Sequence, residues 1–430
     1  MYRVGGIGCG TIFDRAHAPA YAYTYGAKLV GFYDVNIKNA EFAMRNYANL
    51  LKDVVDGKAQ YHITTLFEDS PIFTPTVDTP YSDEQWIEQC KENLNELKVY
   101  TDWRDLLENV DIVDVCTPPK WHVEYALRAL EHNVNVMTEK PPDRSWWQAR
   151  RLRDAVKKSK ATYQYMDDNI YVESYKMFRH VIESGIIGDI NYIELHRGST
   201  AHWHERLANR WFWDPEVAGG GALMDYGSHA SAATWFLAGY DKKIVEVKSQ
   251  GIENKHKTRS IGGIYQKACI DDDAHIKVLF EDPRNKNWVT ASIEASWSGP
   301  LKENNSLDLI GSDGEATRFV DENGKDFLKI TRTSFGHSLR LLPKEIAELD
   351  SIKRGIQNFV MCVKEGKSSI SNEEVAIGVM EILGSAYLSE LRGRVSITPH
   401  EFREFCEETA NKHPEDAPSA ITKELMKPYQ

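Results

Sequence analysis

Two groups of polar residues, far apart in the sequence, have the types and spacing that proton transfer requires. The first is Glu139-Lys140-Pro141, which closes the apolar run 133–138. Such a run predicts a buried strand, and ligands of open α/β sheets bind outside the carboxyl ends of the strands. The proline ends the strand and keeps the lysine backbone extended. The tripeptide therefore places one cation, Lys140, at an edge of the sheet.

The second group lies in the segment 219–229, Gly-Gly-Gly-Ala-Leu-Met-Asp-Tyr-Gly-Ser-His. On a helix, Asp225 and His229 share one face, and Gly227 between them leaves space for a ligand. An imidazole that titrates at about pH 6.5 can take the proton of an alcohol as its hydride leaves. A nearby lysine can stabilise the developing alkoxide. Asp225 then orients either the histidine or the substrate.

A glycine-rich turn near the N-terminus predicts a site for a dinucleotide. Gly8, Gly10, Thr11 and Ile12 lie where a strand gives way to a helix. Glycines there let the backbone approach a pyrophosphate, whose charge the helix N-terminus stabilises. The strict GxGxxG spacing fails, because Phe13 stands where the third small residue belongs, so the turn alone is a weak signal.

Asp34 strengthens this prediction because it ends the second apolar strand at the expected distance from the turn. Its carboxylate can accept hydrogen bonds from the adenosine ribose. No arginine follows it directly, which favours NAD over NADP, although Lys38 is close. The structural alternative for Asp34 is a helix N-cap after the strand.

The segment 116–119, Cys-Thr-Pro-Pro, follows another buried strand and predicts a rigid ledge for a nicotinamide. His122, near the start of the next helix, is either a pocket residue or a packing residue. The residues predicted to bind the cofactor are Gly8, Gly10, Thr11, Ile12, Asp34, Thr117, Pro118, His122, Glu139 and Lys140.

The elements that position these residues change in type along the chain. Alternating strands and helices in the first part indicate βαβ units and a parallel sheet. After about residue 188, strands with few helices between them predict an open antiparallel sheet. The predicted strands are 2–8, 27–33, 97–100, 111–116, 133–138 and 161–166, followed by 191–196, 244–249, 274–280, 289–297 and 307–310. The later helices are predicted at 221–237, 351–364 and 373–391.

A long segment, about 53–96, interrupts the first part. Loops of this length are usually functional or interact with something. Its prolines and its five aromatic residues at 61, 67, 73, 81 and 86 indicate a packed segment rather than a disordered one. It packs on its own domain, on a neighbouring subunit or on a substrate, or it is a surface elaboration.

Composition limits the class of protein. A chain of 430 residues suggests two domains, and 42% hydrophobic with 27% charged residues is typical of soluble globular proteins. The formal net charge of −12 argues against nucleic acid as a partner. No apolar run approaches the roughly 18 residues of a membrane span, and no signal segment is present. We therefore expect a cytoplasmic protein without a membrane partner.

The six cysteines lack CxxC spacing, which fits reduced thiols in the cytosol better than disulfides or a zinc site. An Asp/His pair such as Asp225 and His229 can also be a surface interaction or half of a metal site. No third ligand accompanies it at convincing spacing, so no metal is predicted.

These motifs together resemble the Gfo/Idh/MocA oxidoreductases, the glucose–fructose oxidoreductase and inositol 2-dehydrogenase family. The likeness covers nearly the whole chain, except 53–96 and about the last thirty residues. It rests on Gly8-Cys9-Gly10, Asp34, Thr117-Pro118 with His122, Glu139-Lys140-Pro141, 182–188 (Ile-Glu-Ser-Gly-Ile-Ile-Gly) and 219–229.

The resemblance implies an N-terminal Rossmann domain, residues 1–142 with the 53–96 insertion, and an α/β substrate and oligomerisation domain, residues 143–395. Residues 396–430 are predicted to be a surface tail. The fold class is thus α/β, a Rossmann parallel sheet followed by an α+β domain with an open, largely antiparallel sheet. In the family this open sheet often forms the oligomer interface, so a homodimer or homotetramer is expected.

The resemblance also implies that Lys140, Asp225 and His229 line the reacting hydroxyl, with His229 as acid/base. Two positions depart from the family. Residues 168–170 read Asp-Asn-Ile in place of an Asn-His-Arg-like stretch, and Ala232 stands where many members carry an aspartate. Both positions usually border the substrate, so the identity of the substrate cannot be carried over.

An aromatic and polar loop precedes the glycines, with His202, Trp203, His204, Arg206, Arg210, Trp211, Phe212 and Trp213. Aromatic faces stack on sugar rings while polar groups bind the hydroxyls. The alternative is that these tryptophans belong to the core. The residues predicted to bind the substrate are Lys140, Asp168, Trp211, Trp213, Asp225 and His229.

The sequence thus predicts an NAD-dependent dehydrogenase that acts on a secondary hydroxyl or ketone of a sugar, a sugar derivative or an inositol. One alternative keeps NAD bound and cleaves a glycoside through a transient keto-sugar and elimination. Another is a non-catalytic sensor of sugar and NAD. Net release of NADH separates the dehydrogenase from both.

Overall fold

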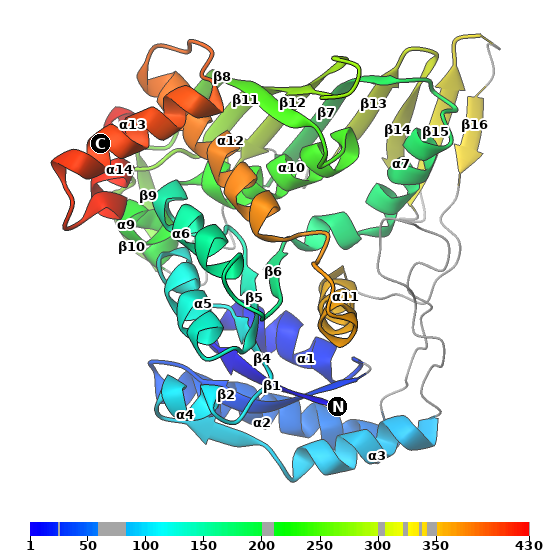
Figure 1. The fold of residues 1–430 in the computed structure, drawn as a ribbon, viewed down its shortest axis with the longest axis vertical. Helices are drawn as coiled ribbons and strands as arrows, with labels where there is room; N and C mark the ends of the chain where they lie inside the picture. Colours follow the sequence, from blue (N-terminus) through cyan, green and yellow to red (C-terminus); the bar gives the residue numbers. More distant parts are fainter. Residues whose placement is uncertain are drawn as a thin grey trace. The chain divides into compact units, whose positions relative to one another are not determined.

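The computed structural model describes residues 1–24, 26–58, 83–199, 210–299, 306–320, 326–334, 338–341 and 351–429. Figure 1 shows their helices and strands. The chain divides into two compact units, each made of separate stretches. Unit 1 comprises Met1–Glu139, Arg151–Tyr171 and Glu345–Glu374; unit 2 comprises Lys140–Arg150, Val172–Lys344 and Val375–Gln430.

Unit 1 contains a six-stranded sheet in the order β3-β2-β1-β4-β5-β6. Every neighbouring pair is parallel, which confirms the predicted Rossmann sheet. The order reverses between β1 and β4, and this is where open α/β sheets bind ligands. The strands are β1 (Tyr2–Ile7), β2 (Ala27–Tyr33), β3 (Lys98–Tyr100), β4 (Ile112–Val115), β5 (Asn135–Glu139) and β6 (Tyr163–Met166).

The helices of unit 1 include one from late in the chain. They are η1 (Phe13–His17), α1 (Ala18–Tyr21), α2 (Ile37–Val55), α3 (Asp83–Leu94), α4 (Trp103–Leu107), η2 (Pro119–Trp121), α5 (His122–Glu131), η3 (Asp168–Tyr171) and α11 (Ser351–Glu365). Helix α6 (Trp146–Val156) starts in unit 2 and ends in unit 1. Gln164 of β6 donates to the main-chain oxygen of Gly355 on α11 at 2.9 Å. The predicted domain 143–395 is therefore not one piece, because β6 and α11 belong to the first unit.

Helix α3 shows where the described end of the 53–96 insertion packs. The indole of Trp86 donates to the main-chain oxygen of Ala22 at 2.7 Å, and the amide of Asn93 donates to that of Leu29 at 2.7 Å. Of the alternatives left open, packing on its own domain holds for α3. Residues 59–82 lie outside the described residues.

Phe13 explains why the glycine pattern departs from GxGxxG. Its ring is fully buried, and a Cβ placed on Gly6 would lie 2.1 Å from it. The extra glycine in the strand therefore makes room for the aromatic ring that replaces the third small residue.

Unit 2 contains an eight-stranded sheet in the order β16-β15-β14-β13-β7-β12-β11-β8. Its neighbouring strands are antiparallel except for β7 and β12, which confirms the predicted open, largely antiparallel sheet. The strands are β7 (Ile190–Gly198), β8 (Lys243–Glu253), β11 (Asp273–Glu281), β12 (Trp288–Ser296), β13 (Leu307–Gly311), β14 (Gly314–Val320), β15 (Asp326–Arg332) and β16 (Ser338–Leu341). A separate hairpin joins β9 (Thr258–Ile261) and β10 (Ile264–Lys267).

Helix α10 (Ala222–Ala238) carries Asp225 and His229 and packs against β7, β11 and β12 (Figure 1). Helix α12 (Glu373–Leu391) covers its other side, where Gly378 makes room for the ring of Trp235. Because α10 is buried on nearly all sides, its sequence is apolar throughout rather than striped. The remaining helices are α7 (Glu173–Glu183), η4 (Arg210–Trp213), α9 (Pro215–Ala218), α13 (Pro399–Lys412), α14 (Ala417–Met426) and η5 (Lys427–Tyr429).

The C-terminal segment differs from the predicted surface tail. Phe402 of α13 and Met426 of α14 are buried, and the guanidinium of Arg144 donates to the hydroxyl of Ser419 at 3.1 Å. Helices α13 and α14 are therefore part of unit 2. Both helices contain many charged residues, so the few apolar positions that pack in the core do not stand out in the sequence.

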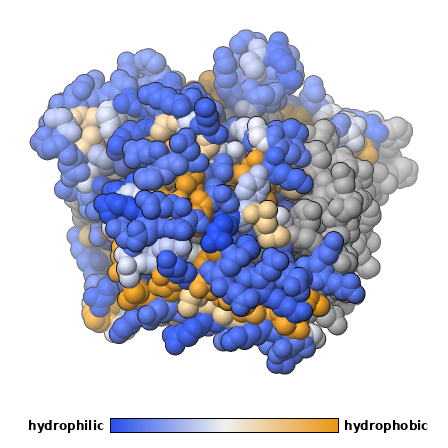
Figure 2. Space-filling model, turned by 60° about the horizontal axis from the view of Figure 1, so that its bottom comes forward, coloured by the Kyte–Doolittle hydropathy of each residue, from blue (hydrophilic) through white to orange (hydrophobic). Residues whose placement is uncertain are grey.

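The face in Figure 2 is mainly hydrophilic, and its hydrophobic residues form narrow strips between polar ones. Among the described helices, none combines the length and the hydropathy needed to cross a membrane.

Candidate active site

Lys140 and Asp225, predicted from two distant motifs, meet in unit 2. The ammonium Nζ donates to Oδ1 of Asp225 at 2.5 Å. The indole Nε1 of Trp297 donates to the other carboxylate oxygen, Oδ2, at 3.1 Å. The side chain of Asp225 is 6% exposed and that of Lys140 is 17% exposed. Since charge-assisted hydrogen bonds are strong when partly desolvated, the carboxylate holds the ammonium in one position.

Asp271 fixes the start of the helix that carries Asp225. Its buried carboxylate accepts the N–H of Gly221 at 2.9 Å, the N–H of Leu223 at 2.8 Å and the hydroxyl of Tyr387 at 2.7 Å. Burial raises the pKa of Asp271, and these hydrogen bonds oppose the rise. The N-terminus of α10 thus stabilises the negative charge of Asp271, as a cation would.

The glycines around α10 are needed for close packing. A Cβ on Gly220 would lie 2.2 Å from the hydroxyl of Tyr387, and one on Gly221 would lie 1.7 Å from the main-chain oxygen of Asp271. Gly227 does not open space for a ligand as expected, because its Cβ would lie 2.6 Å from Leu223. The glycines bring the helix close to Asp271 and α12.

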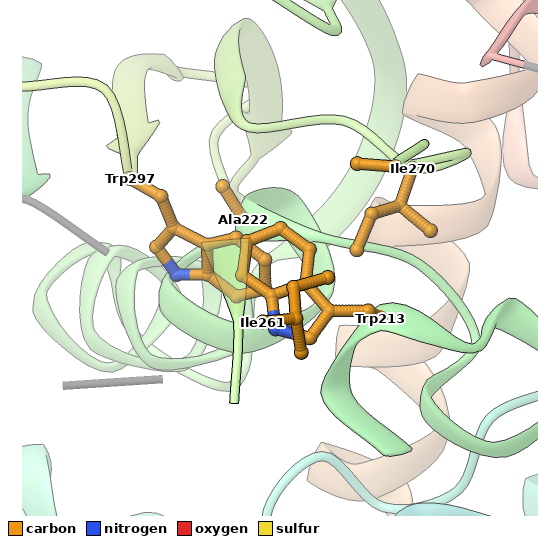
Figure 3. Close-up of a cluster of buried hydrophobic side chains, with 6 residues drawn as sticks. Trp213, Ala222, Ile261, Ile270 and Trp297 are labelled. Carbon is orange, nitrogen blue, oxygen red and sulfur yellow. The ribbon is translucent and has the colours of Figure 1, made fainter. Parts of the chain in front are cut away.

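Trp297 belongs to a buried hydrophobic cluster with Trp213, Ala222, Ile261, Ala268 and Ile270 (Figure 3). The rings of Trp213 and Trp297 lie 5.3 Å apart between centroids. Trp213 is 8% exposed, so it fits the core alternative rather than the predicted substrate contact. Packing of this cluster holds the indole that binds Asp225.

The other predicted substrate residues have different surroundings. Trp211 is partly exposed and stacks on Phe212, with 3.7 Å between ring centroids. Asp168 belongs to unit 1, where it accepts the hydroxyl of Ser351 at 2.7 Å. His202, Trp203, His204 and Arg206 lie outside the described residues.

His229 lies one helical turn after Asp225 on α10 and is 8% exposed. Asp225 is predicted to orient this histidine or the substrate. The structure pairs the Asp225 carboxylate with Lys140 and Trp297. This carboxylate therefore holds the lysine, and its role toward His229 or the substrate stays a prediction.

In unit 1, Asp34 ties together the turns after β1 and β2. Its Oδ2 accepts the N–H of Cys9 at 2.8 Å, and its Oδ1 accepts the N–H of Asn36 at 2.8 Å. The N-cap of α2 is Asn36, whose side chain accepts the N–H of Lys38. The alternative that Asp34 is the N-cap is therefore wrong.

The glycine turn lies against the loop that follows β4. Gly8 has a φ of +87°, and a Cβ there would lie 2.7 Å from the amide nitrogen of Thr117. His122 is buried and its Nε2 bonds the main-chain oxygen of Thr117 at 2.5 Å. His122 therefore fixes this loop as a packing residue, the second of its two alternatives.

These residues fit a dinucleotide. A Cβ on Gly10 would meet no described atom within 4 Å, and Ile12 and Val35 are 43% and 86% exposed. The hydroxyl of Thr117 is buried without a hydrogen-bond partner among the described residues. An open turn, exposed apolar side chains and an unused hydroxyl are what an adenosine and a nicotinamide require.

Comparison with known proteins decides the family. A model described as "Oxidoreductase family, NAD-binding Rossmann fold" matches residues 77–166, and one described as "GFO/IDH/MocA C-terminal domain" matches residues 175–317. This chain belongs to the Gfo/Idh/MocA family. Like that family, it is an NAD-dependent oxidoreductase, which confirms the predicted enzyme class and cofactor.

Several relatives of this Gfo/Idh/MocA chain act on sugars by name. D-glucoside 3-dehydrogenase of Escherichia coli strain K12 is 24% identical over 404 residues, 91% of this chain and 96% of the relative. Glucose-6-phosphate 3-dehydrogenase of Bacillus subtilis strain 168 is 23% identical over 314 residues, 72% of each chain. A solved levoglucosan dehydrogenase in complex with NADH and levoglucosan has the same fold, with a TM-score of 0.71, 17% identity and coverage of 92% and 99%.

Sequence reasoning missed Trp297, Asp271 and Tyr387. Trp297 closes a predicted strand, and Asp271 begins a run of three acids that follows an apolar residue. An acidic run just before a buried strand is a usable signal, because a charge beside the core needs a partner. The partners of Trp297 and Tyr387 depend on tertiary packing.

Replacing Trp297 with Phe should lower kcat by about tenfold or more. The substitution keeps an aromatic ring but leaves a buried carboxylate oxygen of Asp225 without its donor, which costs about 1–3 kcal/mol. Steady-state kinetics check this expectation. Trp235→Phe is the matched control, because that indole donates to the main-chain oxygen of Lys242; an equal loss of kcat in both variants would contradict the assignment.

Replacing Asp34 with Ala should weaken NADH binding by about 10- to 100-fold, since a hydrogen bond to a charged group contributes about 1.5–3 kcal/mol. Fluorescence titration measures the affinity. Asp102→Ala is the control, because Asp102, the N-cap of α4, likewise accepts a main-chain N–H in unit 1, that of Arg104. Unchanged affinity in Asp34→Ala would remove Asp34 from the cofactor site.

Proposed function

We propose that this chain is an NAD-dependent dehydrogenase that oxidises a secondary ring hydroxyl of a sugar or glycoside, or reduces the corresponding ketone. The observation that carries the proposal is the Lys140 ammonium held at 2.5 Å by the carboxylate of Asp225. A fixed cation at the end of a sheet strand is suited to bind a hydroxyl oxygen and to stabilise the alkoxide that forms there.

In this proposal each residue has one role at the reacting hydroxyl. Lys140 donates a hydrogen bond to the hydroxyl oxygen, while Asp225 and Trp297 keep the ammonium in place. His229 takes the hydroxyl proton as general base and returns it in the reverse direction. NAD, when bound, accepts the hydride from the carbinol carbon.

Unit 1 supports cofactor binding by the residues predicted from sequence. Asp34 binds the adenosine ribose, and the turn from Gly8 to Ile12 approaches the pyrophosphate. Thr117 and Pro118 contact the nicotinamide end, and Glu139 lies at the end of β5. His122 keeps the Thr117 carbonyl in position.

A sugar ring is the substrate class that the relatives support best. D-glucoside 3-dehydrogenase spans nearly the whole of this chain, and glucose-6-phosphate 3-dehydrogenase spans most of it. Both are named for oxidation at position 3, so we place the reacting hydroxyl at carbon 3 of a glucose-like ring. The partly exposed pair of Trp211 and Phe212 offers an aromatic face for such a ring.

We also propose a cytoplasmic location. The six cysteines are free, which fits a reducing compartment.

We further propose a homodimer or homotetramer that assembles through the open face of the eight-stranded sheet. Polar side chains such as Glu194, His196 and Glu294 lie on this sheet and are partly exposed.

A screen of glycosides, free sugars and inositols with NAD and NADP tests the function. We expect reduced nicotinamide to appear with glucosides and NAD, but not with 3-deoxyglucosides. Wild-type protein is compared with Lys140→Met. Release of free sugar without net NADH would favour glycoside cleavage, and NADH binding without turnover of any substrate would favour a sensor; both outcomes would refute the dehydrogenase.

A further inference from the structure

His17 lies in unit 1 with both ring nitrogens against carboxylates. Nδ1 is 2.8 Å from Oδ2 of Asp114, and Nε2 is 2.9 Å from Oε1 of Glu139. The imidazole is fully buried. Neutral imidazole has one N–H donor, whereas imidazolium has two. Two carboxylate acceptors therefore require the charged form of His17.

Asp114 completes a hydrogen-bond network in which every donor is matched. Besides His17, its carboxylate accepts the hydroxyl of Tyr21 at 3.0 Å and the thiol of Cys116 at 3.4 Å. Burial, together with the charge of Asp114, raises the pKa of Tyr21 and of Cys116, so both remain protonated donors. Burial lowers the pKa of His17, but the carboxylate of Asp114 outweighs it and raises this pKa well above its ordinary value.

The spacing of His17, Asp114 and Cys116 would also suit a metal ion. The hydrogen bonds argue against one, because each of the three ligand groups already bonds another member of the network. A metal would have to displace the protons that these bonds share. The network is therefore complete as a set of charged hydrogen bonds.

The groups that face the His17 imidazolium from neighbouring elements are mainly acidic. From β4 and β5 come Asp114 and Glu139, and from α1 comes Tyr21, with Tyr47 of α2 beyond it. Two charged side chains of α11 have partners of their own. The ammonium of Lys353 lies over the ring of Tyr23, and Arg354 donates to the main-chain oxygen of Tyr171.

We propose that His17 is a positioning residue, a buried imidazolium that fixes the Glu139 carboxylate at the end of β5 and, through the following peptide bond, the start of Lys140. Glu139 is the last residue of its stretch of unit 1 and Lys140 the first of unit 2. The contact between His17 and Glu139 therefore lies directly before Lys140, where the chain passes from the Rossmann sheet to unit 2. The inference rests on the proposed role of Lys140.

The first test compares pH profiles of kcat/KM for wild type and His17→Gln. Glutamine cannot carry the charge, so kcat/KM should fall by up to about 100-fold, the order that misplacement of a reacting group produces. Loss of the neighbouring cation should raise the pKa of the Glu139 carboxylate. The part of the acidic limb that Glu139 sets should therefore move to higher pH. Tyr21→Phe removes only the hydroxyl that donates to Asp114, so it keeps the contact between His17 and Glu139 and should keep the wild-type profile.

Two further variants separate positioning from general damage to the fold. Glu139→Gln should lose the part of the acidic limb that Glu139 sets and keep the part that the general base His229 sets. Adding His17→Gln to it should change the profile little, because His17 then has no Glu139 carboxylate to fix. A His17→Gln profile with the wild-type shape, at any level of activity, would overturn the proposal.

Unfolding midpoints and NADH binding test His17 without any substrate. The raised pKa in the folded state means that the charged imidazole stabilises the protein fully below the unfolded value of about pH 6.5. That contribution falls as pH rises toward the folded value, so the difference between wild type and His17→Gln should shrink from pH 7 to 9. NADH affinity should fall in His17→Gln and Glu139→Gln but not in Tyr21→Phe.

These substrate-free measurements remain decisive if the sugar screen fails. A pH-independent difference in midpoint combined with unchanged NADH affinity would overturn the charged anchor, whatever the enzyme oxidises. One bound metal ion per chain in wild type, lost in Cys116→Ala, would also overturn it, because the cluster would then be a metal site.

Discussion

The carboxylate of Asp225 is the group on which the geometry of the site depends. It lies almost buried, with Lys140 on one oxygen and the indole of Trp297 on the other. Removing either donor would leave a buried charge incompletely satisfied, which is costly in a partly desolvated site. Since each partner comes from a different part of the fold, the strand end, the sheet and α10 must all be in place before the ammonium is positioned.

The surrounding structure makes that arrangement rigid. Asp271 holds the first turn of α10, and glycines 219–221 allow the close approach that this requires. The indole of Trp297 packs against Trp213 and the other members of the buried cluster (Figure 3). In unit 1 the glycine turn, Asp34 and the loop at Thr117 are tied to one another in the same way. In both units these segments are thus positioned by hydrogen bonds between main chain and polar side chains.

The sequence predicts the fold well where local signals are strong. Apolar runs bounded by turn residues gave the strands of unit 1, and β2 begins and ends where predicted. Strands β14 to β16 were missed, because their apolar residues are interspersed with polar and charged ones and form no continuous run. That Lys140 and Asp225 lie near one another could be predicted from two motifs. Their direct ion pair and its support could not, because the partner of an indole or a buried carboxylate is set by tertiary packing. Trp213 was misassigned for a related reason: aromatic residues occur in sugar sites and in cores alike.

The most direct test of the account is the single-turnover rate of hydride transfer in Lys140→Met, measured with a substrate deuterated at the carbinol carbon. The account predicts that NADH still binds, that hydride transfer slows by at least about 100-fold because the ammonium that stabilises the alkoxide is gone, and that an isotope effect shows this step to be limiting. A variant that transfers hydride at the wild-type rate would contradict the central role of the Lys140–Asp225 pair.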